Sequence, residues 1–405
     1  MSATTSTAMQ AVNADSPAQI VGLNVYSLLG NTAMAAQPVI VGALVDLLGF
    51  TPRQAGFVSA AELGGLACGM LALVGIVNRI SRRALALAAI IVIAAANAAT
   101  LLATNLAEIL PLRFINGIGA ALSYSVFLTM AAATRRPERT FGIANAVSIL
   151  ATGLLVLAGP YVIATGGTQG LFLGLASIAI ASLFALPLVP NTTSLHQAGT
   201  ASATAEPPID PTARRLVVFV LLMMFFLYTG HSAIWSYQER IGVAAGIPAR
   251  QIGLLIGTSL MFWGVLGSIA ASVLGLRIGR VWPQVVSLGL SIVAAVALAV
   301  SASAIAFGVT SALVAISWFY GLPYQMGLLA AFDPRGRANI AGSLMTTGGA
   351  ATGPFIGALL IGSGSYSVLG ILAGICYAIA LGLVLPPALG LSRNTSTQQL
   401  SAGRK

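Results

Sequence analysis

Apolar runs long enough to cross a lipid bilayer recur along this chain from Ala18 to Ala388. Each covers about 18 residues or more, and a helix rising 1.5 Å per residue then spans a hydrocarbon core of about 30 Å. The runs are rich in Ala, Leu and Gly and do not alternate with polar residues, which favours helices over membrane strands. The sequence therefore predicts an all-α membrane protein of twelve helices, at roughly 18–48, 54–77, 84–103, 106–133, 141–164, 168–189, 215–244, 251–275, 283–303, 304–332, 340–363 and 366–388.

The composition agrees with a surface that faces hydrocarbon. Hydrophobic residues make up 57% of the 405 residues and charged residues only 7%, whereas about a quarter of the residues of a soluble domain are charged. The polar start of the chain has no Lys or Arg, and the first apolar run is too long for the core of a cleaved signal peptide. The first apolar run is therefore expected to be a membrane helix.

The net charge of +10 indicates topology and not a nucleic-acid partner. Of the 19 Lys and Arg residues, Arg53, Arg240 and Arg250 fall on one side of the predicted helices and Arg113 lies within a helix. All the others fall on the opposite side, which the positive-inside rule makes cytoplasmic. We therefore expect a multi-pass protein of the inner (plasma) membrane of a bacterium, with both termini in the cytoplasm.

One long polar stretch, rich in Ser, Thr, Ala and Pro, separates six predicted helices from the next six. Such a composition is typical of a flexible linker. The chain is thus expected to comprise an N-terminal tail, a six-helix bundle, a cytoplasmic linker, a second six-helix bundle and a C-terminal tail (1–17, 18–189, 190–214, 215–388 and 389–405).

The two halves repeat one another. In the fifth and eleventh helices, Ala144-Asn145 and Gly159-Pro160 match Ala338-Asn339 and Gly353-Pro354 at one constant offset. The residues around the starts of the second and eighth helices also correspond: Gly49, Pro52, Arg53, Gln54 and Gly56 against Gly246, Pro248, Arg250, Gln251 and Gly253. These echoes predict a duplicated unit, and two bundles that face each other across a cleft can expose a solute site to one side at a time.

The fourth helix carries Arg113-Phe-Ile-Asn116-Gly117-Ile-Gly119-Ala120-Ala121, which resembles the R-x-x-Q-G-x-G-A-A pattern of the major facilitator superfamily. Gly159 and Pro160 match part of that family's antiporter motif, and the eleventh helix holds a fuller copy: Gly349, Gly353, Pro354 and Gly357. The resemblance covers residues 18–388 and implies two pseudo-symmetric six-helix bundles. It also implies a central cavity lined by helices one, four, seven and ten.

The loop after the second helix is similar to the family signature G-x-x-x-D-R-x-G-R-R. It keeps Arg79, Arg82 and Arg83, whereas Asn78 stands where the family has Asp. The resemblance marks this loop as a gating element. A second loop on the same side, with Asp333 and Arg335, is either a gating latch or a solvated turn.

Glu62 and Arg113 are the clearest charges inside predicted membrane helices. Both lie about 10 Å from the same ends of their helices, at 1.5 Å per residue, so an ion pair or a shared cavity is feasible. Their counterparts in the second half are near Ser259 and Ser311, which are uncharged. The hypothesis is that Glu62 takes and releases a proton while Arg113 tunes it or pairs with an anionic substrate. The alternative is a static structural salt bridge.

Further polar and aromatic residues within the helices are candidates for lining the cleft. His231 and Trp235 share a helix face, as do Tyr320 and Tyr324, which could flank a ring-bearing solute. The alternative for each is interhelical packing or hydrogen bonding. The full candidate set is Asn31, Gln37, Asn116, His231, Trp235, Tyr320, Tyr324 and Gln325.

Enzymatic functions find no support in the sequence. Lys405 is the only Lys, so the Lys of a phosphate-binding loop is missing, and His196 and His231 lack metal-ligand spacing. The expected function is secondary active transport of a small organic solute, with an organic anion as one option, coupled to protons through alternating access. A drug or metabolite efflux antiporter and a channel are the alternatives. The expected partners are the solute and the lipid bilayer, with no nucleic acid, no cofactor beyond the proton gradient, and a monomeric state.

Overall fold

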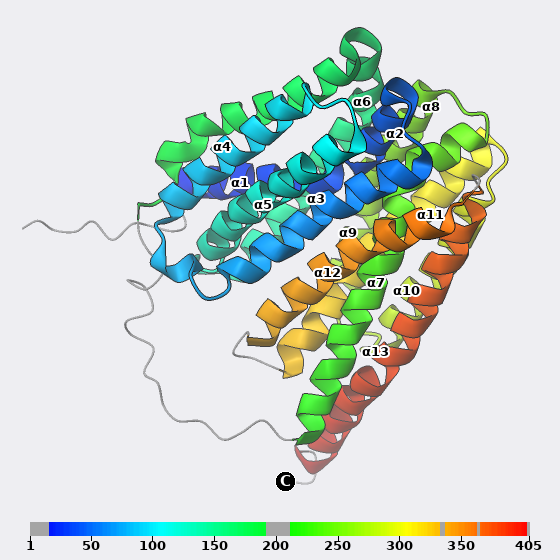
Figure 1. Ribbon diagram of the computed structural model, residues 1–405. Helices are drawn as coiled ribbons and strands as arrows, with labels where there is room; N and C mark the ends of the chain where they lie inside the picture. Colours follow the sequence, from blue (N-terminus) through cyan, green and yellow to red (C-terminus); the bar gives the residue numbers. More distant parts are fainter. Residues whose placement is uncertain (1–15, 192–210, 333–336, 363–364, 403–405) are drawn as a thin grey trace, which may run out of the picture.

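The computed structural model describes residues 16–191, 211–332, 337–362 and 365–402, and this part of the chain is helical without strands. Figure 1 shows the helices as two groups, one from each half of the sequence. The longer helices are α1 (Pro17–Ala35), α2 (Gln37–Leu48), α3 (Pro52–Leu73), α4 (Arg82–Thr100), α5 (Leu106–Ala131), α6 (Pro137–Ala181), α7 (Pro211–Ala244), α8 (Ala249–Thr258), α9 (Val265–Leu274), α10 (Val281–Ala299), α11 (Ala304–Phe332), α12 (Arg337–Leu360) and α13 (Ser367–Ala402).

Nine helices of the described chain are long and apolar enough to cross a membrane, and the bent pair α1–α2 makes a tenth span. The helix α6 contains Gly167 at φ 58° and ψ −149°, where the chain turns back, so that it holds two crossings. The helix α12 is rich in Gly and Thr, which lower its hydropathy. With these two additions the helices are consistent with the twelve predicted crossings.

The first predicted helix differs from a straight rod. It consists of α1 and α2, which bend by 43° at Ala36. Pro38 has no N–H, so the carbonyl of Met34, four residues earlier, loses its helical partner. The bend thus leaves the Met34 carbonyl, in the middle of the membrane span, to a hydrogen-bond donor other than the N–H four residues later.

Two other helices also depart from the prediction. The eighth span is interrupted by a π-helical turn at Ser259–Gly264 between α8 and α9. The last helix, α13, continues past Pro386 and Pro387 to Ala402, so the residues predicted as a C-terminal tail begin in helix. These prolines remove two helical donors without ending the helix.

Glycines of the repeated motifs lie where the two bundles touch. A Cβ added to Gly56 on α3 would lie 1.7 Å from the hydroxyl of Tyr237 on α7. A Cβ on Gly253 of α8 would lie 2.8 Å from Pro160 on α6. The helix pairs α3–α12 and α6–α8 are equivalent contacts across the interface. The echoes in the sequence thus mark a two-fold set of close helix contacts, which need small residues.

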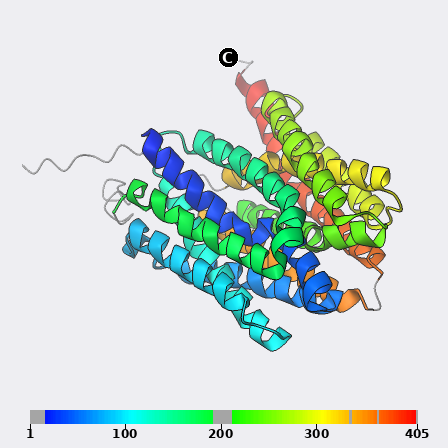
Figure 2. The ribbon, with the colours of Figure 1, turned by 90° about the horizontal axis from the view of Figure 1, so that it is seen from above.

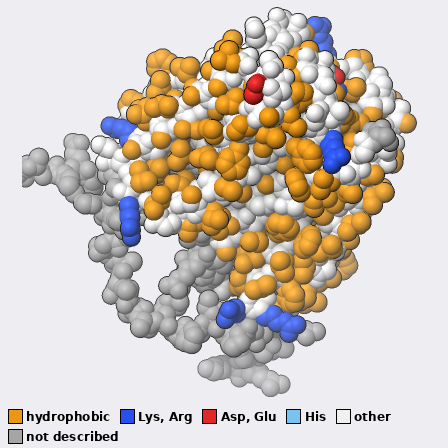
Figure 3. All heavy atoms as spheres, in the orientation of Figure 1, with side chains coloured by type: hydrophobic (Ala, Val, Ile, Leu, Met, Phe, Trp, Pro, Cys, Tyr) orange, Lys and Arg blue, Asp and Glu red, His pale blue; other side chains and the backbone are white. Residues whose placement is uncertain are grey.

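The bundles meet at one end of the molecule and separate at the other (Figures 1 and 2). At the closed end, here called the Asp46 end, Asp46 of α2 binds Arg240 of α7 through two contacts of 2.6 Å. The hydroxyl of Tyr237 donates to the carbonyl of Pro52 nearby at 3.2 Å. The opposite end, here called the Arg79 end, carries the basic turns. Between the two ends the surface in Figure 3 is largely apolar, as expected for contact with lipid.

Candidate functional site

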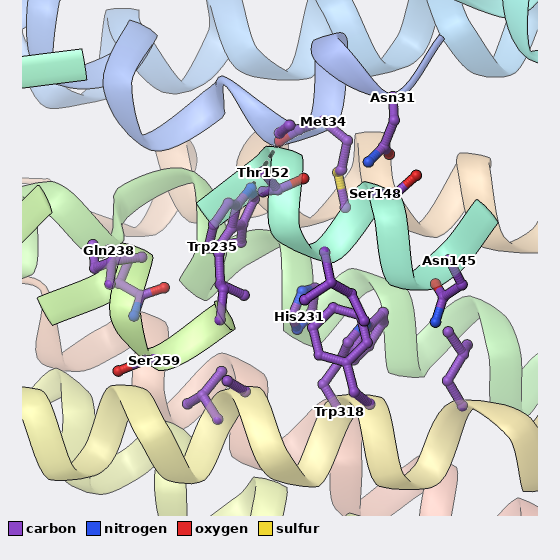
Figure 4. Close-up of a pocket in the computed structure, with 18 of the residues that line it drawn as sticks. Asn31, Met34, Asn145, Ser148, Thr152, His231, Trp235, Gln238, Ser259 and Trp318 are labelled. Atoms are coloured by element: carbon purple, nitrogen blue, oxygen red, sulfur yellow. Dashed lines mark hydrogen bonds between the residues drawn. The ribbon is translucent and has the colours of Figure 1, made fainter. Parts of the chain in front are cut away.

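A cavity of about 220 Å³ lies between the two halves. Its walls come from α1, α5 and α6 of the first half and from α7, α8 with the adjoining π-turn, and α11 of the second (Figure 4). The cavity is therefore formed at the interface that would move if one bundle rocked against the other.

The two halves contribute different chemistry to this pocket. The first half supplies amides and hydroxyls, here called the polar wall: Asn31, Asn145, Ser148 and Thr152. The second half supplies aliphatic side chains, the polar Gln238, Ser259 and Ser311, and a group of rings, here called the aromatic wall: Tyr228, His231, Trp235, Trp318 and Phe319. On that wall the rings of His231 and Trp318 stack with centroids 3.6 Å apart, and the ring of Tyr228 meets Trp318 edge-on at 4.9 Å. A solute in the pocket would contact both walls at once.

The bend between α1 and α2 provides one contact that joins the halves beside the pocket. The indole N–H of Trp235 donates to the carbonyl of Met34 at 2.7 Å. This is the carbonyl that Pro38 leaves without a helical donor. Trp235 is buried, with an exposed fraction of 6%, so its indole N–H needs such a partner.

Glu62 and Arg113 form an ion pair, one of the two arrangements that their matched depth made feasible. Nη1 of Arg113 lies 3.6 Å from Oε1 of Glu62, and both side chains are buried. The amide of Asn116 donates to the same carboxylate oxygen, and the amide of Gln37 donates to the other at 3.2 Å. Nη2 of Arg113 donates to Asn97, and its guanidinium lies 5.1 Å from the ring centroid of Phe172.

This network reaches the second half through two hydroxyls. The hydroxyl of Ser59 donates to Oε1 of Gln37 and lies 2.9 Å from the hydroxyl of Ser236 on α7. Both serines are fully buried. A hydrogen-bonded chain therefore runs from the Glu62 carboxylate across the interface between the bundles.

The charge pair is not part of the pocket wall. Neither Glu62 nor Arg113 lines the cavity, and the described residues that do line it include no Asp, Glu, Lys or Arg. Both side chains are almost fully buried, with exposed fractions of 0% for Arg113 and 1% for Glu62. In this conformation Arg113 cannot contact a solute in the pocket.

The predicted cleft residues divide into three groups: residues that line the pocket, residues bound to Glu62, and residues late in α11. Asn31, His231 and Trp235 line the pocket. Gln37 and Asn116 do not line it, because their side chains are engaged with Glu62.

The third group, Tyr320, Tyr324 and Gln325 late in α11, does not line this pocket in the described conformation. The hydroxyl of Tyr324 donates to Ala271 on α9, and its ring packs on Tyr320, with centroids 5.4 Å apart. Gln325 is buried near Gly321 and Ser287, on the side of α10. The face that these residues occupy is turned toward α9 and α10 instead of the other half.

The predicted gating loops are described only in part. Asp333, Arg335 and the side chain of Asn78 lie outside the described residues. Arg83 donates to the carbonyls of Val189 and Pro187, so it ties the start of α4 to the end of the same bundle. These hydrogen bonds of Arg83 stay within the first half. Arg79 is exposed and Arg82 is buried.

Several pocket residues were missed by sequence reasoning: Tyr124, Asn145, Ser148, Thr152, Tyr228, Gln238, Ser259, Trp318 and Phe319. One signal was available. Ser259 and Ser311, the uncharged counterparts of Glu62 and Arg113, both line the pocket, and Ser311 accepts a hydrogen bond from Gln238 at 3.0 Å. The second half thus presents neutral groups at the positions where the first half buries its charges.

Comparison with known proteins identifies the architecture. A family model described as Major Facilitator Superfamily matches residues 23–347. The solved structure of the nucleoside transporter NupG is similar, with a TM-score of 0.70 over 91% of this chain and 99% of that chain, at 15% identity. At that identity the likeness concerns the fold. No curated protein matches the sequence.

Proposed function

Because the chain belongs to the Major Facilitator Superfamily and is a transporter rather than an enzyme, we propose that it is a secondary active transporter that carries a small organic solute by alternating access. The observation that supports this most directly is the pocket between the bundles, to which each half contributes three membrane-spanning segments. The Asp46 end is closed above it by contacts between α2, α3 and α7. Opening that end while closing the other would transfer the pocket contents across the membrane.

The same proposal assigns the energy source to protons through Glu62. Its carboxylate accepts hydrogen bonds from Gln37 and Asn116 and faces Arg113. Protonation would cancel its charge and place a donor on one of the two oxygens that now accept from Gln37 and Asn116, so the network that continues through Ser59 to Ser236 would have to rearrange. Proton binding would then bias the contact between the halves, although Arg113 itself does not reach the solute. In this proposal Arg113 pairs with Glu62 and not with an organic anion.

The proposed orientation places the Arg79 end in the cytoplasm. The Arg residues of the loops concentrate there, while Arg53 and Arg250 lie at the other end. In this orientation, in the inner membrane of a bacterium, the described conformation opens toward the cytoplasm. Either import or efflux could use the same cycle.

The test is exchange in proteoliposomes. Solutes that raise the thermal stability of the purified protein are loaded inside vesicles, and uptake of the same labelled solute is followed without a gradient. A carrier gives saturable uptake that is accelerated by unlabelled solute on the opposite side. Flux that rises linearly with concentration and shows no such acceleration would instead indicate the channel alternative.

A further inference from the structure

We propose that the pocket selects an uncharged solute with a planar ring, which lies against the aromatic wall while the hydrogen-bonding groups of the solute contact the polar wall. This assignment rests on the transport function proposed above and names the substrate class for it.

The absence of a net charge follows from what lines the cavity. Its described lining holds amides, hydroxyls, rings and aliphatic groups but no ionised Asp, Glu, Lys or Arg side chain. The buried charges of the first half neutralise each other in their own network. During alternating access the solute passes through a state closed to water on both sides, and an ion would lose its hydration there without a counter-charge.

His231 does not change this conclusion. Its ring is stacked on Trp318, and its Nδ1 is buried without a hydrogen-bond partner in the described part of the chain. No described carboxylate holds the imidazole as a cation. His231 therefore presents a flat neutral ring, and neither of its ring nitrogens makes a hydrogen bond within the described chain.

The planar ring of the solute follows from the aromatic wall. Tyr228, His231 and Trp318 are each only partly buried, so parts of their rings remain accessible from the cavity. The edge-on contact between Tyr228 and Trp318 fixes the orientation of the indole. A planar ring would gain contact area and favourable ring geometry here, which an aliphatic group would gain only in part.

The hydrogen-bonding groups of the solute follow from the opposite wall. Asn31, Asn145, Ser148 and Thr152 line the cavity, and their side chains make no hydrogen bond within the described chain. Figure 4 shows these side chains on the helices that face Trp318 and His231. Two amides and two hydroxyls can together donate and accept, so they suit hydroxyl or amide groups on the edge of the solute.

The experiment uses two sets of three probes with the purified full-length protein. Each set holds an uncharged ring compound, its anionic relative and a relative without the ring: phenyl glucoside, phenyl glucuronide and methyl glucoside; and uridine, uridine monophosphate and ribose. Binding is measured by the shift in thermal unfolding and by quenching of tryptophan fluorescence. We expect the uncharged ring compound of at least one set to bind at least about tenfold more tightly than both of its relatives.

Variants connect that preference to the pocket. Trp318→Ala should abolish the shift in thermal unfolding that the probe causes, and Trp318→Phe should reduce it. Trp282→Ala is the control, because that indole has an exposed fraction of 65%, and it should leave the shift unchanged. Asn145→Ala should weaken binding by about tenfold, as for one lost hydrogen bond to the solute. The melting temperature without probe shows whether each variant is folded.

The outcomes separate the two proposals. Tighter binding of the anionic relatives, or no binding of either uncharged ring compound, would overturn the assignment of the substrate class. A bound anion that exchanges in proteoliposomes would overturn that assignment but leave the transporter intact. An uncharged ring compound that binds in the pocket but is never exchanged would support the assignment of the site and contradict transport.

Discussion

The carboxylate of Glu62 is held by side chains from two neighbouring elements, with Gln37 on α2 and both Asn116 and Arg113 on α5. Because Ser59 continues this network to Ser236 in the other bundle, a change of charge on Glu62 can reach the interface without passing through the pocket. One prediction tests this coupling role, and a second tests what the ion pair contributes to stability.

Replacing Glu62 by Gln keeps the shape of the side chain but removes the titrating group. We expect Glu62→Gln to retain counterflow exchange of solute and to lose accumulation driven by an imposed pH gradient. Both are measured in proteoliposomes. Glu108→Gln is the matched control, because Glu108 is exposed and bonds only near its own helix start. Undiminished gradient-driven accumulation in Glu62→Gln would remove the proton role.

Removing only Arg113 should destabilise the protein. In Arg113→Met the carboxylate of Glu62 stays buried but loses its positive partner. Breaking a buried ion pair in this way typically lowers the free energy of unfolding by about 3–5 kcal/mol. We expect a clearly lower melting temperature for Arg113→Met and a substantial recovery in the double variant Glu62→Gln/Arg113→Met. If the double variant is no more stable than Arg113→Met, the loss comes from packing against Phe172 and not from the unpaired charge.

Sequence position was sufficient to pair Glu62 with Arg113, since depth in a helix follows from residue count. It could not show that the pair lies outside the pocket, because that depends on how each helix is rotated within its bundle. The same rotation turns Tyr320 and Tyr324 toward α9 while Trp318, two residues before Tyr320, faces the cavity.

At the scale of elements, the bend between α1 and α2 links backbone chemistry to the contact between halves. Pro38 frees the carbonyl of Met34, and Trp235 of the other bundle donates to it. This hydrogen bond is broken whenever α7 moves away from the bend. It therefore contributes to the stability of the conformation closed at the Asp46 end.

Trp235→Phe should lose this hydrogen bond, which is worth about 1 kcal/mol. Its loss should shift the equilibrium roughly fivefold toward the conformation that is open at the Asp46 end. Pro38→Ala should act in the same direction, since the new N–H of residue 38 competes for the Met34 carbonyl. The distance between the halves at the Asp46 end is measured with spin labels at Leu102 and Ile305, which are exposed positions of opposite halves. The labels are introduced into a variant without Cys68 and Cys376.

Both substitutions act on one hydrogen bond, so the double variant should shift the distance distribution little more than either single one. Fully additive shifts would show that Pro38 and Trp235 act independently. Trp282→Phe serves as the control for loss of an indole elsewhere.

The membrane helices could be predicted from hydropathy, but the bends and irregular turns inside them could not. Pro38 lies within a continuous apolar run, which gave no sign that Trp235 would use the released carbonyl. The π-helical turn at Ser259–Gly264 has no proline to announce it. Both irregular segments border the pocket, where departures from regular helix are tolerated in membrane proteins.

At the scale of the whole molecule, the sequence repeat predicts two bundles but does not predict at which end they are in contact. The asymmetry arises from residues that the repeat does not share. Asp46 and Arg240 join the halves at one end, and Glu239 flanks Arg240 with a contact of 2.5 Å. The sequence placed Arg240 on the side of the membrane with few cations, but only the spatial arrangement of Asp46, Arg240 and Glu239 shows that they close the interface.

Asp46→Asn should weaken this closure. Because Asp46 is half exposed, at 51%, the ion pair is worth at most about 1 kcal/mol, and the shift toward a longer Leu102–Ile305 distance should stay within about fivefold. High salt should produce the same shift in the wild type and little further change in Asp46→Asn. A salt response of equal size in both proteins would assign the closure to other contacts.

The most direct test of the account measures both ends of the molecule together. One label pair is Leu102 with Ile305 at the Asp46 end, and the other is Ile76 with Ile278, exposed residues of the basic turns at the Arg79 end. Distances are recorded by double electron–electron resonance at low and high pH and with a bound solute. Alternating access predicts that whenever one distance lengthens the other shortens. Distances that stay fixed under every condition, or that lengthen together, would contradict it.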